Sequence, residues 1–122
     1  MVSVGSYLKS IDNSGAREVQ CLKILGNSGA RYGYAGSVII VSLTKINPAK
    51  KLKKGEVHRA VVVCTKKSKV RYNGICVSFG FNGVVIVNQK NLPIGTRILY
   101  PVMLELRQQK LLKILSMATV AV

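Results

Sequence analysis

Hydrophobic and polar positions along the chain follow one another in short stretches, and most of these stretches have the composition of β-strands. Apolar and β-branched residues gather in six stretches that turn residues separate, and a seventh stretch is weaker. The expected strands are Tyr7–Ile11, Glu18–Leu25, Val38–Thr44, Val57–Thr65, Ile75–Phe79 and Val84–Val87, with Arg97–Met103 as the weaker candidate. Many short strands at close spacing predict a small barrel or a sandwich. A closed barrel is attractive because closure removes the sheet edges.

Two local patterns sharpen this expectation. The run Ala60–Thr65 is apolar without a polar break, which predicts a buried strand. Asn73-Gly74 lies between two expected strands, and this dipeptide favours the tight turn of a β-hairpin.

The last third of the chain changes to a helical pattern. Residues 104–115 contain no Gly or Pro and favour helix. Leu104, Leu111 and Leu115 can share one helical face, while Arg107 and Lys110 fall on another. We therefore expect one or two short helices packed on the barrel. The apolar residues 117–122 then form either another strand or an ordered tail.

Composition adds a strong charge to this β-rich picture. The 122 residues include 19 Lys or Arg and only four acids, which gives a formal net charge of +15. Hydrophobic residues make up 48%, so a disordered basic tail is excluded and one domain over residues 1–122 is expected. Self-repulsion at this charge is costly for a free monomer, so a partner is expected to neutralise it. No apolar run is long enough to span a bilayer, and the first residues do not resemble a signal or transit peptide.

The charge is concentrated between Lys45 and Arg71, where ten of 27 residues are Lys or Arg and Glu56 is the only acid. Two basic clusters flank the apolar run Ala60–Thr65, which suggests two loops held beside one another on a rigid scaffold. Nucleic acid is the natural counterpart of such a surface. The residues expected to bind RNA are Arg17, Lys45, Lys50, Lys51, Lys53, Lys54, Arg59, Lys66, Lys67, Lys69 and Arg71.

The aromatic residues indicate which kind of nucleic acid is bound. Tyr32, Tyr34 and Tyr72 have loop-like contexts, whereas Phe79 and Phe81 are expected in the core. Single-strand binding needs several exposed rings on one sheet face, and aromatics are only 6% of this chain. The pattern therefore favours backbone and shape readout of folded RNA.

Catalytic and metal-binding patterns are missing from the sequence. The four acids are widely spaced, His58 is the only histidine, and no phosphate-binding glycine motif occurs. The three cysteines are odd in number and form no C-x-x-C pair, so buried free thiols are expected. Neither an enzyme nor a cofactor or metal site is expected. Two alternatives to a structural RNA-bound protein stay open: a free-standing RNA-binding barrel that acts as an assembly factor or RNA chaperone, and a polybasic protein of membrane surfaces.

Three blocks of residues, spread over essentially the whole chain, match the pattern of one family. The middle block consists of Ala60–Val63, Asn73-Gly74, Phe79, Asn82 and Val85-Ile86. The first block consists of Asp12–Arg17, Cys21, Lys23 and Leu25-Gly26, and the last of Pro93–Ile98, Pro101-Val102, Glu105–Arg107 and Lys113-Ile114. Together they resemble the large-subunit ribosomal protein fourteen family of bacterial, organellar and cytosolic ribosomes.

The resemblance implies a closed five-stranded β-barrel with a protruding hairpin and short C-terminal helices. It also implies a non-enzymatic constituent of the large subunit that binds large-subunit rRNA and contributes to intersubunit bridges with small-subunit rRNA. The implied neighbours are ribosomal proteins three and nineteen of the large subunit and, in bacterial-type ribosomes, the ribosomal silencing factor. The surface implied for bridges and silencing-factor docking comprises Thr96, Arg97, Arg107, Lys110, Lys113 and Ser116.

The chain departs from the family's usual pattern at a few positions. Gly80 and Phe81 stand where an Asp-Gly pair is common, and Tyr100 replaces a usual Gly. The end of the chain, residues 117–122, lacks the usual Pro and acid. The scarcity of acids, the three cysteines and the apolar bias indicate an organelle-encoded mitochondrial protein, although a bacterial or plastid origin fits the same motifs.

Overall fold

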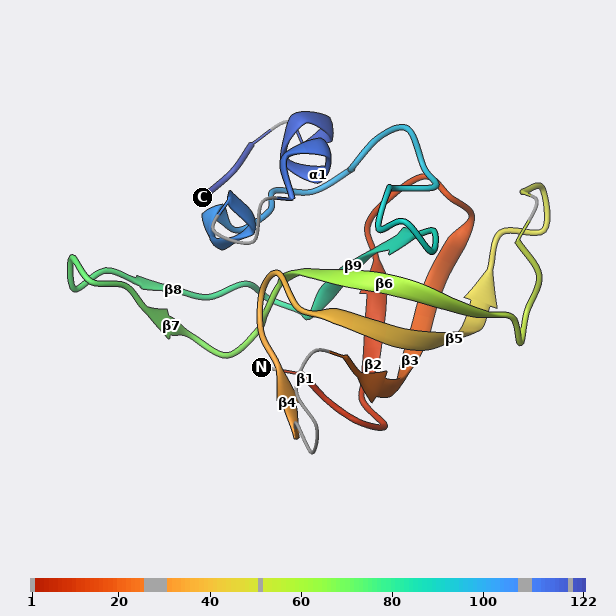
Figure 1. Cartoon of the computed structure of the whole chain (residues 1–122), viewed down its shortest axis with the longest axis horizontal. Coiled ribbons are helices and arrows are strands. Elements are labelled where there is room, and N and C mark those ends of the chain that lie inside the picture. The colour runs from red at the N-terminus through yellow and green to blue at the C-terminus, as the bar shows by residue number, and fades with distance from the viewer. Residues whose placement is uncertain (1, 26–30, 51, 108–110, 119) are drawn as a thin grey trace.

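Five strands close into a barrel in the order β2-β3-β5-β6-β9 (Figure 1). The computed structural model describes residues 2–25, 31–50, 52–107, 111–118 and 120–122. The barrel strands are β2 (Tyr7–Ser10), β3 (Ala16–Ile24), β5 (Val38–Ile46), β6 (Val57–Cys64) and β9 (Gly83–Val87). Neighbouring strands are antiparallel except β2 and β9, which pair in parallel through Lys9 with Gly83 and Ser10 with Val84. The predicted closed barrel is confirmed, and the sandwich alternative was wrong.

Shorter elements surround the barrel. They are β1 (Val2–Ser3) paired with β4 (Tyr32–Gly33), β7 (Lys69–Val70) paired with β8 (Cys76–Val77), the 3-10 helix η1 (Leu104–Arg107) and the helix α1 (Leu112–Met117). The β7–β8 hairpin protrudes from the barrel, as expected (Figure 1). Its turn contains Asn73-Gly74, with Gly74 at φ +82°, and the Asn73 side chain accepts a hydrogen bond from the Ile75 N–H at 3.1 Å. The sequence did not predict β1, β4 or β7, which are only two residues long.

The protein has two hydrophobic cores that share the wall formed by β6 and β9. Ala60 and Val62 of β6 belong to the cluster inside the barrel, to which all five barrel strands contribute. Val61 and Val63 belong to a second cluster with Leu106 and Ile114 of the C-terminal segment. Both faces of β6 are therefore covered, because the C-terminal segment packs on the outside of the barrel. This arrangement explains why the apolar run of β6 has no polar break.

The C-terminal segment differs from its prediction in two respects. Residues 97–103 do not form a strand; within the described chain they make isolated bridges from Ile98 to Asp12 and from Val102 to Ala121. The reason is that this segment crosses over the barrel wall, so that the Met103 N–H bonds to the Val63 carbonyl at 2.9 Å without a continuous ladder.

The buried face of the helical region also differs from the expected one. Leu106 and Ile114 are 0% and 1% exposed, whereas Leu104 is 39% exposed. A regular helix through residues 104–115 would place Leu104, Leu111 and Leu115 on one face. The segment instead contains the separate elements η1 and α1, so the periodicity of one helix does not apply.

The cysteines are free thiols, but they are not all buried. Cys21 and Cys64 lie in the core, whereas Cys76 is exposed on β8. The expectation for Cys76 was wrong because β8 stands clear of the barrel, where one face of a two-stranded hairpin stays in solvent. Phe79 and Phe81, both expected in the core, are partly buried and pack against the outer cluster.

Candidate nucleic-acid interface

The two basic clusters lie at opposite ends of β6. One occupies the β5–β6 loop, residues 47–56, and the other follows β6 and enters the protruding hairpin (Figure 1). The expectation that the two loops are held beside one another was therefore wrong. Eight residues of strand separate them, and at about 3.3 Å per residue an extended strand of this length spans roughly 26 Å. The structure offers two separate cationic regions.

The β5–β6 loop presents its lysines around one buried anchor. Leu52 is 9% exposed and belongs to the barrel core, whereas Lys50, Lys53 and Lys54 are exposed. Backbone hydrogen bonds hold both ends of the loop, from the Asn47 N–H to Gly15 O at 2.7 Å and from Gly55 to Leu43 at 2.8 Å. A single apolar residue among lysines thus fixes the loop to the barrel, and the cations face solvent. Lys51 lies outside the described residues.

Other predicted RNA-binding residues flank this loop on the barrel strands. Arg17 on β3 is exposed, and Lys45 on β5 is exposed with its Nζ 3.7 Å from Glu18 Oε2. Arg59 on β6 is half-buried and donates to the Gln89 carbonyl at 3.4 Å and to Asn91 Oδ1 at 3.5 Å. Lys45 and Arg59 therefore have protein partners, whereas Arg17 is exposed without a described ion pair or hydrogen bond.

The only acid of the basic stretch is engaged by a neighbour. Glu56 Oε2 lies 2.7 Å from His58 Nε2, and this hydrogen bond lowers the pKa of the Glu56 carboxyl below its usual value.

Arg71 is only partly exposed, and its guanidinium bonds to the C-terminal segment instead of projecting with the other cations. Its Nε donates to Glu105 Oε1 at 2.7 Å and its Nη2 to Glu105 Oε2 at 3.2 Å, and the guanidinium also contacts the Val122 carbonyl. The hydrogen bonds to Glu105 raise the pKa of Arg71. The Arg71–Glu105 ion pair therefore ties the hairpin to η1.

The rest of the second cluster lies at the base of the hairpin. Lys66 and Lys67 are exposed, and the Lys66 N–H donates to Asn82 Oδ1 at 2.8 Å. The side chain of Lys69 is outside the described part of the structure.

The described residues proposed for the intersubunit surface fall on three segments, which are the loop after β9, η1 and α1. Thr96 and Arg97 are exposed in the loop after β9, where both backbone N–H groups donate to Asn13 Oδ1, at 2.7 and 3.1 Å. Lys113 and Ser116 are exposed on α1, and Arg107 is exposed on η1. Lys110 lies outside the described residues. Sequence reasoning missed the role of Asn13, although it stands within the first family block.

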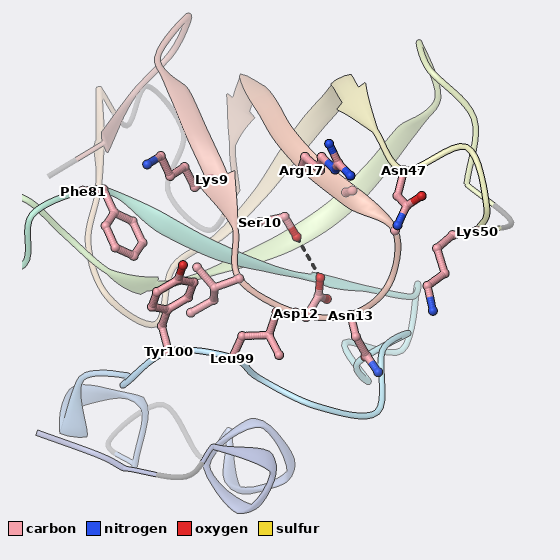
Figure 2. Close-up of a pocket in the computed structure, with 13 residues that line it drawn as sticks. Lys9, Ser10, Asp12, Asn13, Arg17, Asn47, Lys50, Phe81, Leu99 and Tyr100 are labelled. Atoms are coloured by element: carbon pink, nitrogen blue, oxygen red, sulfur yellow. Dashed lines mark hydrogen bonds between the residues drawn. The ribbon is translucent and has the colours of Figure 1, made fainter.

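A groove of about 420 Å³ lies beside the β5–β6 loop, and we call it the Tyr100 groove (Figure 2). Its lining comes from the β2–β3 loop, the β5–β6 loop and the segments around Phe81 and Tyr100. Two of the predicted RNA-binding residues, Arg17 and Lys50, line it, and Lys9, which the sequence did not single out, lies at its other end. Lys9 lies outside the basic clusters, and a lone lysine on a strand gives no indication of RNA binding in the sequence.

Two further observations concern other classes of site. In the described part of the chain, no three His, Cys, Asp or Glu side chains gather in a way that could hold a metal ion. None of the described helices has the length and apolar character needed to cross a membrane.

Comparison with protein families gives a match over the whole chain. The family described as ribosomal protein L14p/L23e matches residues 1–122. That family consists of structural constituents of the large ribosomal subunit, which act without enzymatic activity.

Proposed function

The chain belongs to the ribosomal protein L14p/L23e family, and we propose that it binds large-subunit rRNA through its β5–β6 loop. The observation that carries this proposal is the arrangement of Lys50, Lys53 and Lys54, all exposed around the buried anchor Leu52. Lysines on a fixed loop neutralise RNA phosphates and release counterions. Because the loop is bound to the barrel at both ends, its cations need little ordering when they meet the RNA backbone.

The remaining cations extend this interface in two directions. Arg17 and Lys45 continue it over β3 and β5, and Lys66 and Lys67 form a second contact at the base of the hairpin. Arg59 and Arg71 are half-buried and hydrogen-bonded to protein groups, so we expect them to contribute less to RNA binding than the exposed lysines of the β5–β6 loop. Folded RNA suits two separated cationic regions because a helix can present phosphates to both.

The second part of the proposed function is contact with small-subunit rRNA across the subunit interface. We place the contact with small-subunit rRNA on Thr96, Arg97, Arg107 and Lys113 with Ser116, which are exposed on the C-terminal third. Their family positions support this assignment. The same support extends to large-subunit proteins three and nineteen as neighbours and to the ribosomal silencing factor as a ligand of this surface. The chain's scarcity of acids supports a mitochondrial ribosome.

Sedimentation tests the proposed function directly. Tagged protein, expressed in its own host and released by gentle lysis, should migrate with the large-subunit peak in near-stoichiometric amount. A stable soluble pool with only traces on the ribosome would instead identify a free-standing RNA-binding barrel, and binding to anionic vesicles that RNA does not compete would identify a membrane-surface protein. Either result would overturn the proposal.

A further inference from the structure

The Tyr100 groove combines an aromatic end with a cationic end. Figure 2 shows Phe81 and Tyr100 on one side, with Lys9 near the Phe81 ring, and Asn47 and Lys50 on the other. The phosphate contacts proposed for the β5–β6 loop do not require such a concave surface, because lysines on a convex loop suffice for them. The groove therefore needs an explanation of its own.

The aromatic end is formed by two rings that the protein does not cover completely. The centroids of Phe81 and Tyr100 are 5.5 Å apart with their planes at 75°, an edge-to-face arrangement, and Lys9 Nζ lies 5.3 Å from the Phe81 centroid. Tyr100 is 50% exposed, so part of its ring faces the solvent. Rings in this position offer a stacking surface to a planar group, and Lys9 adds a cation beside it.

The cationic end is positioned by a glycine. The stem of Lys50 crosses the β2–β3 loop at Gly15, where φ is +110° and where an added Cβ would overlap the Lys50 side chain. The Asn47 N–H bonds to the carbonyl of the same glycine at 2.7 Å. Lys50 is therefore held at the edge of the groove, and Arg17 lines the same space.

The floor of the groove presents little negative charge to a ligand. Asp12 is the one acid among the lining residues, and it is 5% exposed. Its Oδ1 accepts hydrogen bonds from the hydroxyls of Ser10 and Ser14, each at 2.7 Å, and its Oδ2 accepts one from the Ile86 N–H at 3.1 Å. Both carboxylate oxygens are thus engaged by the protein.

We propose that the Tyr100 groove binds one unpaired nucleotide of RNA, its base against Phe81 and Tyr100 and its phosphate near Arg17 and Lys50. This inference rests on the proposed function and adds a subsite to it. A volume of about 420 Å³ falls in the range of sites for small ligands, between roughly 300 and 1,000 Å³. A paired base in a helix is stacked and cannot enter, whereas a bulged base can be splayed out and stacked on a ring.

The test compares two RNA hairpins that differ by one bulged nucleotide. The bulge carries 2-aminopurine, whose fluorescence falls when it stacks on an aromatic ring. The wild-type protein should quench this fluorescence and should bind the bulged hairpin more tightly than the fully paired one, by roughly 10-fold. Tyr100→Leu, which keeps an apolar side chain but removes the ring, should lose both effects and leave binding of the paired hairpin unchanged. Tyr100→Phe should retain them.

Matched variants separate this inference from the proposed function. Tyr72→Leu removes a tyrosine that is fully exposed on the hairpin, away from the groove, and should change neither measurement. Phe81→Leu supplies a second variant, and circular dichroism with thermal melting checks that each variant is folded. Equal binding of both hairpins by the wild type, with no quenching, would overturn the groove assignment while leaving rRNA binding intact. Failure to bind either hairpin and absence from the large-subunit peak would overturn the proposed function itself.

A poly-glutamate peptide tests whether charge alone explains the binding. If, at equal molar charge, it displaced the bulged and the paired hairpins equally, and the wild type did not quench 2-aminopurine, the groove would act only as a cationic surface. That result would also overturn the proposal, because stacking of a base would then contribute nothing to recognition.

Discussion

At the scale of single residues, burial decides how each of the three thiols behaves. Burial raises the pKa of the Cys64 thiol to about 11 and also raises the pKa of Cys21. Cys64 Sγ lies against β9 at Gly83, where an added Cβ would come 2.6 Å from the sulfur, so that space is closed to reagents as well as to water. Cys76, on the exposed face of β8, is open to reagents.

Thiol labelling should therefore distinguish Cys76 from the buried Cys21 and Cys64. At pH 8, a disulfide reagent such as 5,5′-dithiobis(2-nitrobenzoic acid) should react rapidly with one thiol of the native protein, because only an accessible thiolate attacks. All three should react in denaturant, and Cys76→Ser should remove the fast phase. Rapid native labelling of Cys64 would contradict the described packing.

A charge placed inside the barrel should unfold it. Val62 is 0% exposed and points into the barrel core, so Val62→Asp places a carboxylate where no water can solvate it. We expect a loss of more than about 4 kcal/mol in the free energy of unfolding. Val57→Asp on the same strand is the control, because Val57 is 60% exposed and its change should stay within about 0.5 kcal/mol. Urea denaturation followed by circular dichroism measures both.

At the scale of elements, the hairpin and the C-terminal segment depend on each other. The Arg71–Glu105 ion pair joins the hairpin turn to η1, and Glu105 is only 7% exposed. η1 and α1 in turn cover the outer face of β6 and β9 through Leu106 and Ile114. The orientation of the hairpin is therefore coupled to the element that completes the outer core.

Arg71→Ala should loosen the hairpin without opening the barrel. Removal of the guanidinium takes a charge-assisted partner from a buried carboxylate, which we expect to cost about 1–3 kcal/mol in the free energy of unfolding. Amide hydrogen exchange in residues 69–77 should accelerate while exchange in β6 stays slow. Arg107→Ala removes an exposed arginine of η1 and should leave both measurements unchanged. Equal effects of the two variants would show that the ion pair contributes neither to the free energy of unfolding nor to the protection of the hairpin.

The same elements show what the sequence could and could not predict. The apolar run of β6 was sufficient to predict a buried strand, and Asn73-Gly74 was sufficient to predict a hairpin turn. Both predictions succeeded because burial and turn geometry are local requirements. Residues 97–103 were misread because Ile98, Val102 and Met103 pack on the outer core while the described backbone makes only isolated bridges. The charge of Arg71 was assigned to RNA because a partner 34 positions away in sequence is invisible to a local pattern. The Tyr100 groove was missed for the same reason, since distant segments line it.

At the scale of the whole molecule, the distribution of charge predicts a salt response. Changing Lys50, Lys53 and Lys54 together to Gln removes three exposed cations and leaves the anchor Leu52 in place. If all three contact phosphates, the plot of the log of the rRNA-binding constant against log salt should become shallower. The magnitude of its negative slope should drop by about 2.7, at about 0.9 per contact. Fluorescence anisotropy over a salt series measures this slope, and the melting temperature should not change.

A second triple variant controls for charge alone. Lys23, Arg31 and Lys90 are exposed cations outside the β5–β6 loop, and changing them to Gln lowers the net charge by the same amount. Its effect on the slope should be smaller. If the two triple variants behaved alike, the β5–β6 loop would have no special role in RNA binding.

The parallel pairing of β2 with β9 has a consequence for the order of events during synthesis. Lys9 pairs with Gly83, so a growing chain cannot close the barrel until its last barrel strand has emerged. Until then β2 has a free edge and the interior of the barrel is open to water, a state in which strand edges pair with other chains. Contacts between strands so distant in sequence also fold slowly, within about milliseconds to seconds. Closure of the barrel therefore waits for β9. A nascent chain halted before residue 83 should depend on chaperones to stay soluble.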